Sequence, residues 1–162
     1  MGKETKTNAM RILDRHKIPY ELFQYECEDF VDGIHVADQN GVPREQSFKT
    51  LVMRGKSGAY YVLVIPVELS VDLKAAARAL EEKSIEMIPV KDITAVTGYV
   101  RGGCSPIGMK KQYPTVIHET ACQFDTIYVS GGRKGTTIAV NPMQLAEVCG
   151  ARFEKVWEEN EK

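Results

Sequence analysis

The chain has 162 residues and a formal net charge of −1, from 21 basic and 22 acidic side chains, and 43% of its residues are hydrophobic. These values suit one globular domain with its own core and exclude a disordered, fibrous or membrane-embedded chain. The balanced charge also argues against binding along long nucleic-acid duplexes, which needs a clear basic excess, but it allows a local contact with a nucleic-acid end.

The predicted elements begin with an amphipathic helix over residues 5–16, a strand over 20–26 and a short helix within 32–46. The clearest feature follows in residues 47–66, where two runs of strand-forming residues flank Gly55-Lys56-Ser57-Gly58. This pattern predicts a β-hairpin.

A well-defined helix is predicted next, over residues 71–83, with Asp72 as its N-cap. Its expected apolar stripe consists of Leu73, Ala76, Ala77 and Leu80. A short strand over 85–90 and a helix over 90–98, closed by Gly98, complete this part.

After a glycine-rich stretch, strands are predicted over residues 115–119, 126–132 and 136–140. A helix over 141–150 and a last strand over 151–157 follow. The caps of this helix are Asn141, Pro142 at its first position, and Gly150 just past its end. Because strands outnumber helices and both interleave irregularly, we expect one α+β domain over residues 1–162, with a mixed, strongly curved sheet.

Cysteines and histidines are scattered without the spacing of metal ligands, so we expect no metal site. They are Cys27, Cys104, Cys122, Cys149, His16, His35 and His118. The chain shows no signal peptide or long apolar run, which predicts a cytoplasmic protein with free thiols and no membrane contact. His118 could act as a base and Cys104 as a nucleophile only if another group oriented them, and core or surface roles fit both better.

Lys49 is unusual because strand alternation places it on the same face as the apolar Leu51 and Met53. A lysine on an apolar face loses hydration unless it has a partner or a task. Two interpretations stay open: an edge lysine whose ammonium group reaches water, or a functional cation.

The stretch "GYVRGGCSPIGMKK", residues 98–111, holds four glycines and three cationic side chains. It lacks the Lys and Ser/Thr of a phosphate-binding loop and is not GxGxxG after a strand, so it does not predict a nucleotide site. Either it is a structural loop, or the backbone N–H groups near Gly102 and Gly103 approach a carbonyl oxygen.

A second glycine turn, "VSGGRKG" at residues 129–135, is either a hairpin turn with solvated bases or part of a phosphate-binding patch. The cations of that patch would be Lys110, Lys111, Arg133 and Lys134.

Four segments together resemble the YbaK family of stand-alone aminoacyl-tRNA deacylases, relatives of the editing domain of bacterial prolyl-tRNA synthetases. They are "FKTLVMR", "GYVRGGCSPIGMKK", "PTVIHE" and "YVSGGRKG", in the family's order. The resemblance covers about residues 10–153. It implies a mixed α/β fold with a barrel-like sheet and flanking helices, and no cofactor.

The resemblance also implies an activity: removal of an amino acid wrongly attached to tRNA, typically cysteine on tRNA(Pro), in which the thiol of the substrate attacks its own ester. Lys49 and Gly102 are the expected catalytic residues. The residues expected to contact the substrate are Tyr25, Gly103, Cys104, Ser105, Ser130, Gly131, Gly132 and Thr137. The expected partners are the acceptor end of mischarged tRNA(Pro) and a prolyl-tRNA synthetase.

One position departs from the family pattern. Many members have an Asp where this chain has Thr137, which cannot carry a negative charge. The amino acid selected therefore stays open between cysteine, on tRNA(Pro) or tRNA(Cys), and another small residue such as alanine. A catalytically silent module that binds tRNA or a synthetase is the alternative from another functional class.

Overall fold

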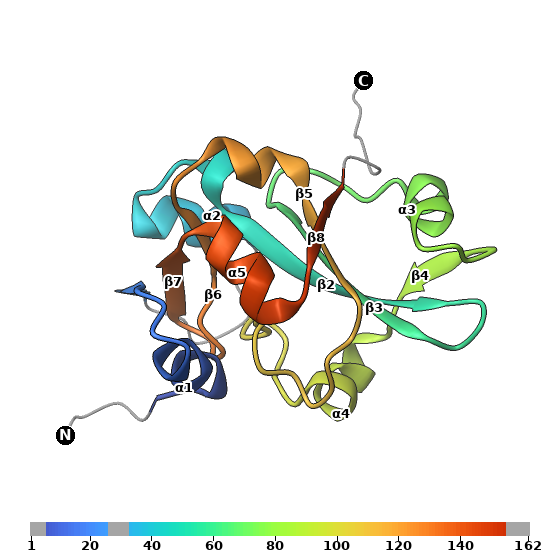
Figure 1. Ribbon diagram of the computed structural model, residues 1–162, viewed down its shortest axis with the longest axis horizontal. Coiled ribbons are helices and arrows are strands. Elements are labelled where there is room, and N and C mark those ends of the chain that lie inside the picture. The colour runs from blue at the N-terminus through green and yellow to red at the C-terminus, as the bar shows by residue number, and fades with distance from the viewer. Residues whose placement is uncertain (1–5, 26–32, 155–162) are drawn as a thin grey trace.

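The computed structural model describes residues 6–25 and 33–154, and its strands form two sheets (Figure 1). The first sheet has the strand order β1-β7-β6 and the second has the order β4-β2-β3-β5-β8. The strands are β1 (Glu21–Gln24), β2 (Phe48–Gly55), β3 (Tyr60–Pro66), β4 (Ile85–Met87), β5 (Thr115–His118), β6 (Ile127–Ser130), β7 (Thr136–Val140) and β8 (Arg152–Glu154).

Five α-helices and three short 3-10 turns connect these strands within the described ranges. The helices are α1 (Asn8–Arg15), α2 (Gly33–Asn40), α3 (Leu73–Ala79), α4 (Ile93–Thr97) and α5 (Pro142–Cys149). The 3-10 turns are η1 (Arg44–Gln46), η2 (Val90–Asp92) and η3 (Glu119–Gln123). Each predicted helix and strand is present, but α3 ends at Ala79 where residue 83 was predicted, β4 ends at Met87 where residue 90 was predicted, and the helix predicted over 90–98 is η2 followed by α4. The ends of the first helix, the first strand and the last strand, like Cys27, lie outside the described residues.

Local sequence accounts for the helix ends. The side chains of Asp72 and Asn141 accept hydrogen bonds from backbone N–H groups in the first turns of α3 and α5. Gly98 and Gly150 end α4 and α5 in the left-handed conformation that glycine adopts without steric cost. These four predicted caps are confirmed, as is Pro142 at the first position of α5.

The predicted α+β fold is confirmed, but the strands do not close into one barrel. The five-stranded sheet is mixed, because β2 pairs antiparallel with β3 and β4, while β5 lies parallel to β3 and β8. Within residues 6–25 and 33–154, the two sheets meet at one parallel bridge, between Ser47 and Tyr128. Beyond it, a cavity lined by both β2 and β6 takes the place of further pairing between the sheets.

The main core lies between the two sheets, where α1 and α5 cover it (Figure 1). Its buried side chains include Leu13 of α1, Leu145 of α5, and Ile117, Ile127 and Ile138 of three strands. On the opposite side of the molecule, α3 lies beside β4 (Figure 1).

One predicted core residue is misplaced, because Leu73 is 45% exposed. It belongs to the first turn of α3, and burial of this helix begins only at Ala75. Three consecutive alanines, Ala75 to Ala77, let the helix approach the sheet closely over Met53 and Leu63.

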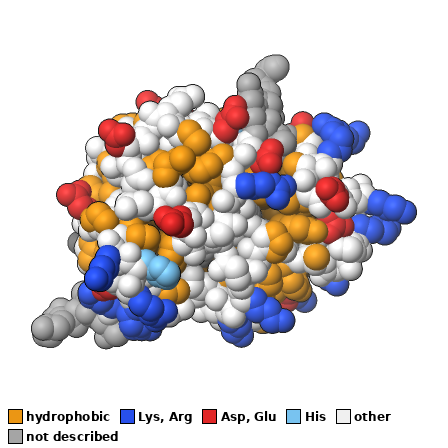
Figure 2. Space-filling view, in the orientation of Figure 1, with side chains coloured by type: hydrophobic (Ala, Val, Ile, Leu, Met, Phe, Trp, Pro, Cys, Tyr) orange, Lys and Arg blue, Asp and Glu red, His pale blue; other side chains and the backbone are white. Residues whose placement is uncertain are grey.

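Figure 2 shows acidic and basic side chains interspersed on the face that carries α5, with hydrophobic side chains between them. This distribution agrees with the near-neutral net charge. It gives this face no broad cationic surface of the kind that long duplexes require.

Candidate functional site

A cavity of about 510 Å³ opens between β2, β6, α2, the glycine-rich stretch and the segment from β4 to α4. It brings together six of the residues predicted for the site: Tyr25, Lys49, Gly102, Cys104, Ser130 and Thr137. These residues span more than a hundred positions of the chain, so their convergence is a property of the fold.

Lys49 lies on β2 opposite Ile65 of β3. Leu51, on the same face, also lines the cavity, while Met53 is fully buried under α3. The predicted position of a lysine among apolar neighbours is confirmed, and its partly buried side chain lines the cavity.

One edge of β2 is open to the cavity. β4 pairs with β2 only from Met53 to Gly55, and the N–H of Ile88 adds one bond to the carbonyl of Val52. The stretch of β2 that includes Lys49 and Thr50 is thus left beside the cavity. Sequence reasoning could not anticipate this edge, because it depends on where a distant strand ends.

The polar residues that line the cavity without having been predicted include Asn40, Thr50 and Arg101. The amide of Asn40 and the hydroxyl of Thr50 are buried without a hydrogen-bond partner among the described residues. For Thr50 and Arg101 the sequence did offer a signal, because each is the neighbour of a predicted site residue: Thr50 follows Lys49 and Arg101 precedes Gly102.

The two glycines of the Gly102–Gly103 pair have different roles. Gly102 lines the cavity and has a φ of +86°, which favours glycine. Gly103 does not line it, and a Cβ there would lie 2.7 Å from two backbone atoms of Arg133. Gly103 is therefore the point where the glycine-rich stretch contacts the backbone of the second turn.

In the second turn, Val129 and Ser130 line the cavity, and the Oγ of Ser130 accepts a hydrogen bond from the N–H of Gly132 at 3.2 Å. This bond leaves the hydroxyl proton able to donate into the cavity. Gly131 and Gly132 lie outside the cavity wall: a Cβ on Gly131 would be 2.9 Å from Cγ2 of Thr136 in β7, and a Cβ on Gly132 would be 2.9 Å from the Cβ of Thr7, the N-cap of α1.

The first turn of α1 holds both glycine turns, which the sequence did not predict. The hydroxyl of Thr7 donates to the carbonyl of Gly131 at 2.5 Å and accepts from the N–H of Met10 as the N-cap. The amide of Asn8 donates to the carbonyl of Gly108 at 2.8 Å. Through these bonds α1 sets the position of both turns relative to each other.

Ser105 and Cys104 shape the wall in different ways. Ser105 is fully buried outside the cavity, and its Oγ accepts from the N–H of Ile107 at 3.2 Å, so it forms the turn. Cys104 lines the cavity, and burial raises the pKa of its thiol to about 11. At neutral pH this thiol is protonated, which agrees with the prediction that it is no nucleophile.

None of the four predicted phosphate-binding cations lines the cavity: Lys110, Lys111, Arg133 and Lys134. Lys110 donates to the carbonyl of Ala95 in α4 at 3.1 Å, and Arg133 donates to Thr136 Oγ1 at 3.3 Å. Lys111 and Lys134 are exposed.

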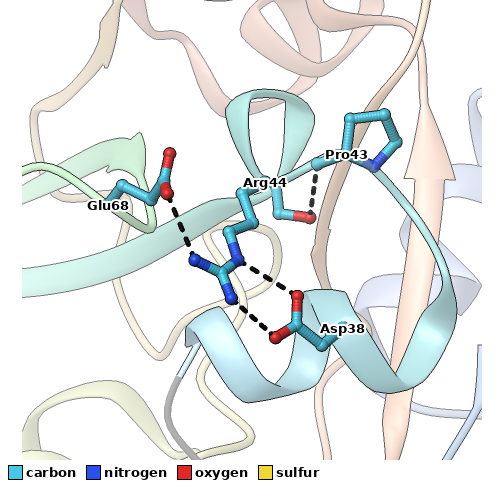
Figure 3. A network of polar contacts seen from close by, with 5 residues as sticks. Asp38, Pro43, Arg44 and Glu68 are labelled. Carbon is cyan, nitrogen blue, oxygen red and sulfur yellow. Dashed lines mark hydrogen bonds and ion pairs between the residues drawn. The ribbon is translucent and has the colours of Figure 1, made fainter.

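The wall formed by α2 is anchored by Arg44 (Figure 3). The guanidinium donates through Nε at 3.1 Å and Nη2 at 2.8 Å to both carboxylate oxygens of Asp38, and Nη1 lies 3.4 Å from Glu68. This network ties the last turn of α2, which carries Asn40, to η1 and to the loop after β3.

In the part of the chain that the structure describes, no group of three or more His, Cys, Asp or Glu side chains could hold a metal ion. Over the same residues, every helix is too short or too polar to span a membrane.

Comparison with known proteins decides the family. The model of the aminoacyl-tRNA editing domain matches residues 31–148. The chain belongs to the aminoacyl-tRNA editing domain family. A curated Enterococcus faecalis protein, EbsC, which is provisionally named a Cys-tRNA(Pro)/Cys-tRNA(Cys) deacylase, is 42% identical over 154 residues, or 94% of each chain.

Solved structures share the fold of this editing domain. A protein provisionally described as a trans-editing enzyme for prolyl-tRNA synthetase has a TM-score of 0.81 and 20% identity, covering 96% of this chain and 100% of its own. The hypothetical protein APE2540 has a TM-score of 0.83 and 20% identity, with 93% and 99% covered. At this level of identity the likeness is one of fold alone.

Proposed function

We propose that this editing domain removes cysteine that has been wrongly attached to tRNA(Pro), by cleaving the ester that links it to the terminal ribose. The observation that carries the proposal is that Lys49 and Gly102, from two distant segments, line one cavity. The Enterococcus faecalis relative supports the choice of substrate, since its name includes Cys-tRNA(Pro) and Cys-tRNA(Cys).

Lys49 supplies positive charge at the cavity wall and orients the phosphate and ribose of the terminal nucleotide. The backbone at Gly102 has no side chain to block the approach of the ester, and its N–H stabilises the negative charge that develops on the carbonyl oxygen. Ser130 donates its hydroxyl proton to the same substrate.

The attacking group belongs to the substrate. Its cysteine sulfur forms a bond to its own carbonyl carbon, the bond to the ribose oxygen breaks, and the thiol proton goes to that oxygen. The cyclic thioester that leaves is then opened by water. Cys104 does not compete as a nucleophile, because burial raises its pKa to about 11.

This mechanism selects substrates by chemistry as well as by size. A cavity that admits cysteine also admits alanine and serine, because a pocket discriminates poorly against smaller side chains. Only a substrate with a thiol can cleave its own ester. Thr137, which lines the cavity without a charge, leaves the ammonium group of the substrate to neutral acceptors.

We also propose that a prolyl-tRNA synthetase assists by raising the local concentration of the substrate. The net charge of −1 predicts weak binding to tRNA alone. Charged tRNA is a cytoplasmic substrate, and we propose that the protein acts in that compartment.

The test is a deacylation assay with tRNA(Pro) charged with cysteine, alanine or serine, and with Cys-tRNA(Cys). We expect rapid loss of cysteine and slow loss of the other two. If alanine is lost as fast as cysteine, the thiol mechanism is wrong and the enzyme is a hydrolase that selects its substrate by size. No loss above the buffer rate for any substrate would contradict the enzyme and favour a silent binding module.

A further inference from the structure

The cavity has a polar part and an apolar part, and the proposed function uses only the polar one. Apolar side chains from the β4–α4 segment form the other part: Met87, Ile88, Val90 and Ile93. A cavity of 510 Å³ lies within the range of about 300–1,000 Å³ that takes a drug-sized ligand. It therefore has room for more than a cysteinyl group.

Two of these apolar side chains are exposed at the rim. Met87 and Val90 are each 54% exposed although both line the cavity. Ile88, which stands between them in the sequence, belongs to a buried cluster with Val52 and Val96. Exposed apolar side chains that border a cavity are a typical contact for a ligand with an apolar surface.

The position of this rim along the sheet indicates which part of a ligand reaches it. Met87 pairs with Met53 of β2, four residues beyond Lys49. At about 3.3 Å per residue, Met87 lies roughly 13 Å along the strand from Lys49. A group bound there is not the reacting ester but a neighbouring part of the same substrate.

We propose that Met87 and Val90 form an apolar shelf that binds the nucleobase of the terminal nucleotide of charged tRNA. This inference rests on the proposed function, in which the amino acid is esterified to the ribose of that nucleotide. The base is then the nearest large apolar group to the ester. Unpaired bases at RNA ends are commonly bound through their flat faces. Arg101 lines the same cavity and supplies positive charge for the adjacent backbone.

The experiment compares three proteins. The double variant Met87→Gln, Val90→Thr keeps the size of both side chains and removes their apolar character. Its matched control is Met143→Gln, because Met143 is 59% exposed on α5 and does not line the cavity. Exposed positions of this kind change stability little, so all three proteins should fold.

Each protein is assayed on Cys-tRNA(Pro), on cysteinyl-adenosine and on a cysteinyl ester of ribose that lacks the base. We expect the double variant to lose at least about fivefold in kcat/KM on the two substrates with a base, the lower range of base contacts. On the ester without a base, kcat/KM of the double variant should equal that of the wild type. The wild type itself should lose activity when the base is removed.

The outcomes separate this proposal from the function on which it rests. If the wild type deacylates Cys-tRNA(Pro) and the double variant matches Met143→Gln, the shelf is refuted and the function stands. An equal loss on the ester without a base would assign the apolar part to the amino acid and also refute the shelf. If the wild type cleaves no substrate, both proposals fall.

Discussion

The hydrogen bond from Thr7 to Gly131 predicts that the first turn of α1 contributes more to stability than an ordinary N-cap. Thr7→Val keeps the shape of the side chain against Gly132 but removes two hydrogen bonds: the cap to the N–H of Met10 and the bond to the carbonyl of Gly131. A lost N-cap costs about 1 kcal/mol, and a further hydrogen bond to a backbone carbonyl about 1 kcal/mol. The expected loss in the free energy of unfolding is thus about 2 kcal/mol.

Asp72→Ala is the matched control, because Asp72 caps α3 through the N–H of Ala75 and its side chain makes no second hydrogen bond of this kind to another described residue. We expect it to lose about 1 kcal/mol. Urea unfolding followed by circular dichroism gives both values from the midpoint and slope of each transition. For a chain of this size each kcal/mol corresponds to a shift of about 2–4 °C in the thermal midpoint.

The two variants should also differ in activity. Thr7→Val releases the second turn, whose Ser130 lines the cavity. We therefore expect KM for charged tRNA to rise about threefold to tenfold, measured under conditions in which the variant is fully folded. Asp72→Ala should leave KM unchanged. Equal losses of stability in the two variants, with equal KM, would refute the role of α1 in holding the turn.

Three further predictions test the surroundings of the cavity. Arg44→Leu breaks the bonds to Asp38 and Glu68 (Figure 3) and should lower the free energy of unfolding only slightly, because these ion pairs are exposed to solvent. This loss of stability should be smaller in 1 M NaCl, where the Debye length is only about 3 Å and salt screens exposed ion pairs. A loss that does not depend on salt would contradict the ionic role of Arg44. Gly103→Ala places a methyl group 2.7 Å from the backbone of the second turn. We expect it to lower the free energy of unfolding, measured in urea, and kcat/KM for deacylation. Wild-type values of both would show that the two turns can move apart without cost. Burial raises the pKa of the Cys104 thiol from 9.0 to about 11. Alkylation of Cys104 in the folded protein, followed by mass spectrometry, should therefore be slow at pH 8 and faster toward pH 11. Rapid alkylation at pH 8 would contradict this burial.

Local sequence was sufficient for the existence of the elements and for the capped helix ends, but not for every end: the helix predicted over 71–83 ends at Ala79 and the strand predicted over 85–90 ends at Met87. Helix caps such as Asp72 and Gly150 act through neighbours within a few residues, so spacing alone identifies them. The alternation of β2 likewise revealed Lys49 as a lysine among apolar neighbours. The resemblance to the YbaK family then gave the order of the motifs and the expected activity, and the family is confirmed.

Contacts between distant segments could not be predicted from the sequence. Gly103, Gly131 and Gly132 were expected to face a substrate, but their space is occupied by Arg133, Thr136 and Thr7. A glycine pattern reports that a backbone is approached closely, without saying by what. The division into two sheets escaped prediction for the same reason, because strand composition does not specify how far two strands stay paired.

The central claim is that Lys49, beside Gly102, makes this cavity a deacylase site. The most direct measurement is kcat/KM for Cys-tRNA(Pro) with Lys49→Ala, compared with Lys74→Ala, which removes an exposed lysine from α3. We expect a loss of at least about a hundredfold for Lys49→Ala, the scale of removing one electrostatic contact to the transition state, and wild-type activity for Lys74→Ala. Activity of Lys49→Ala within twofold of the wild type, in a folded protein, would contradict the account.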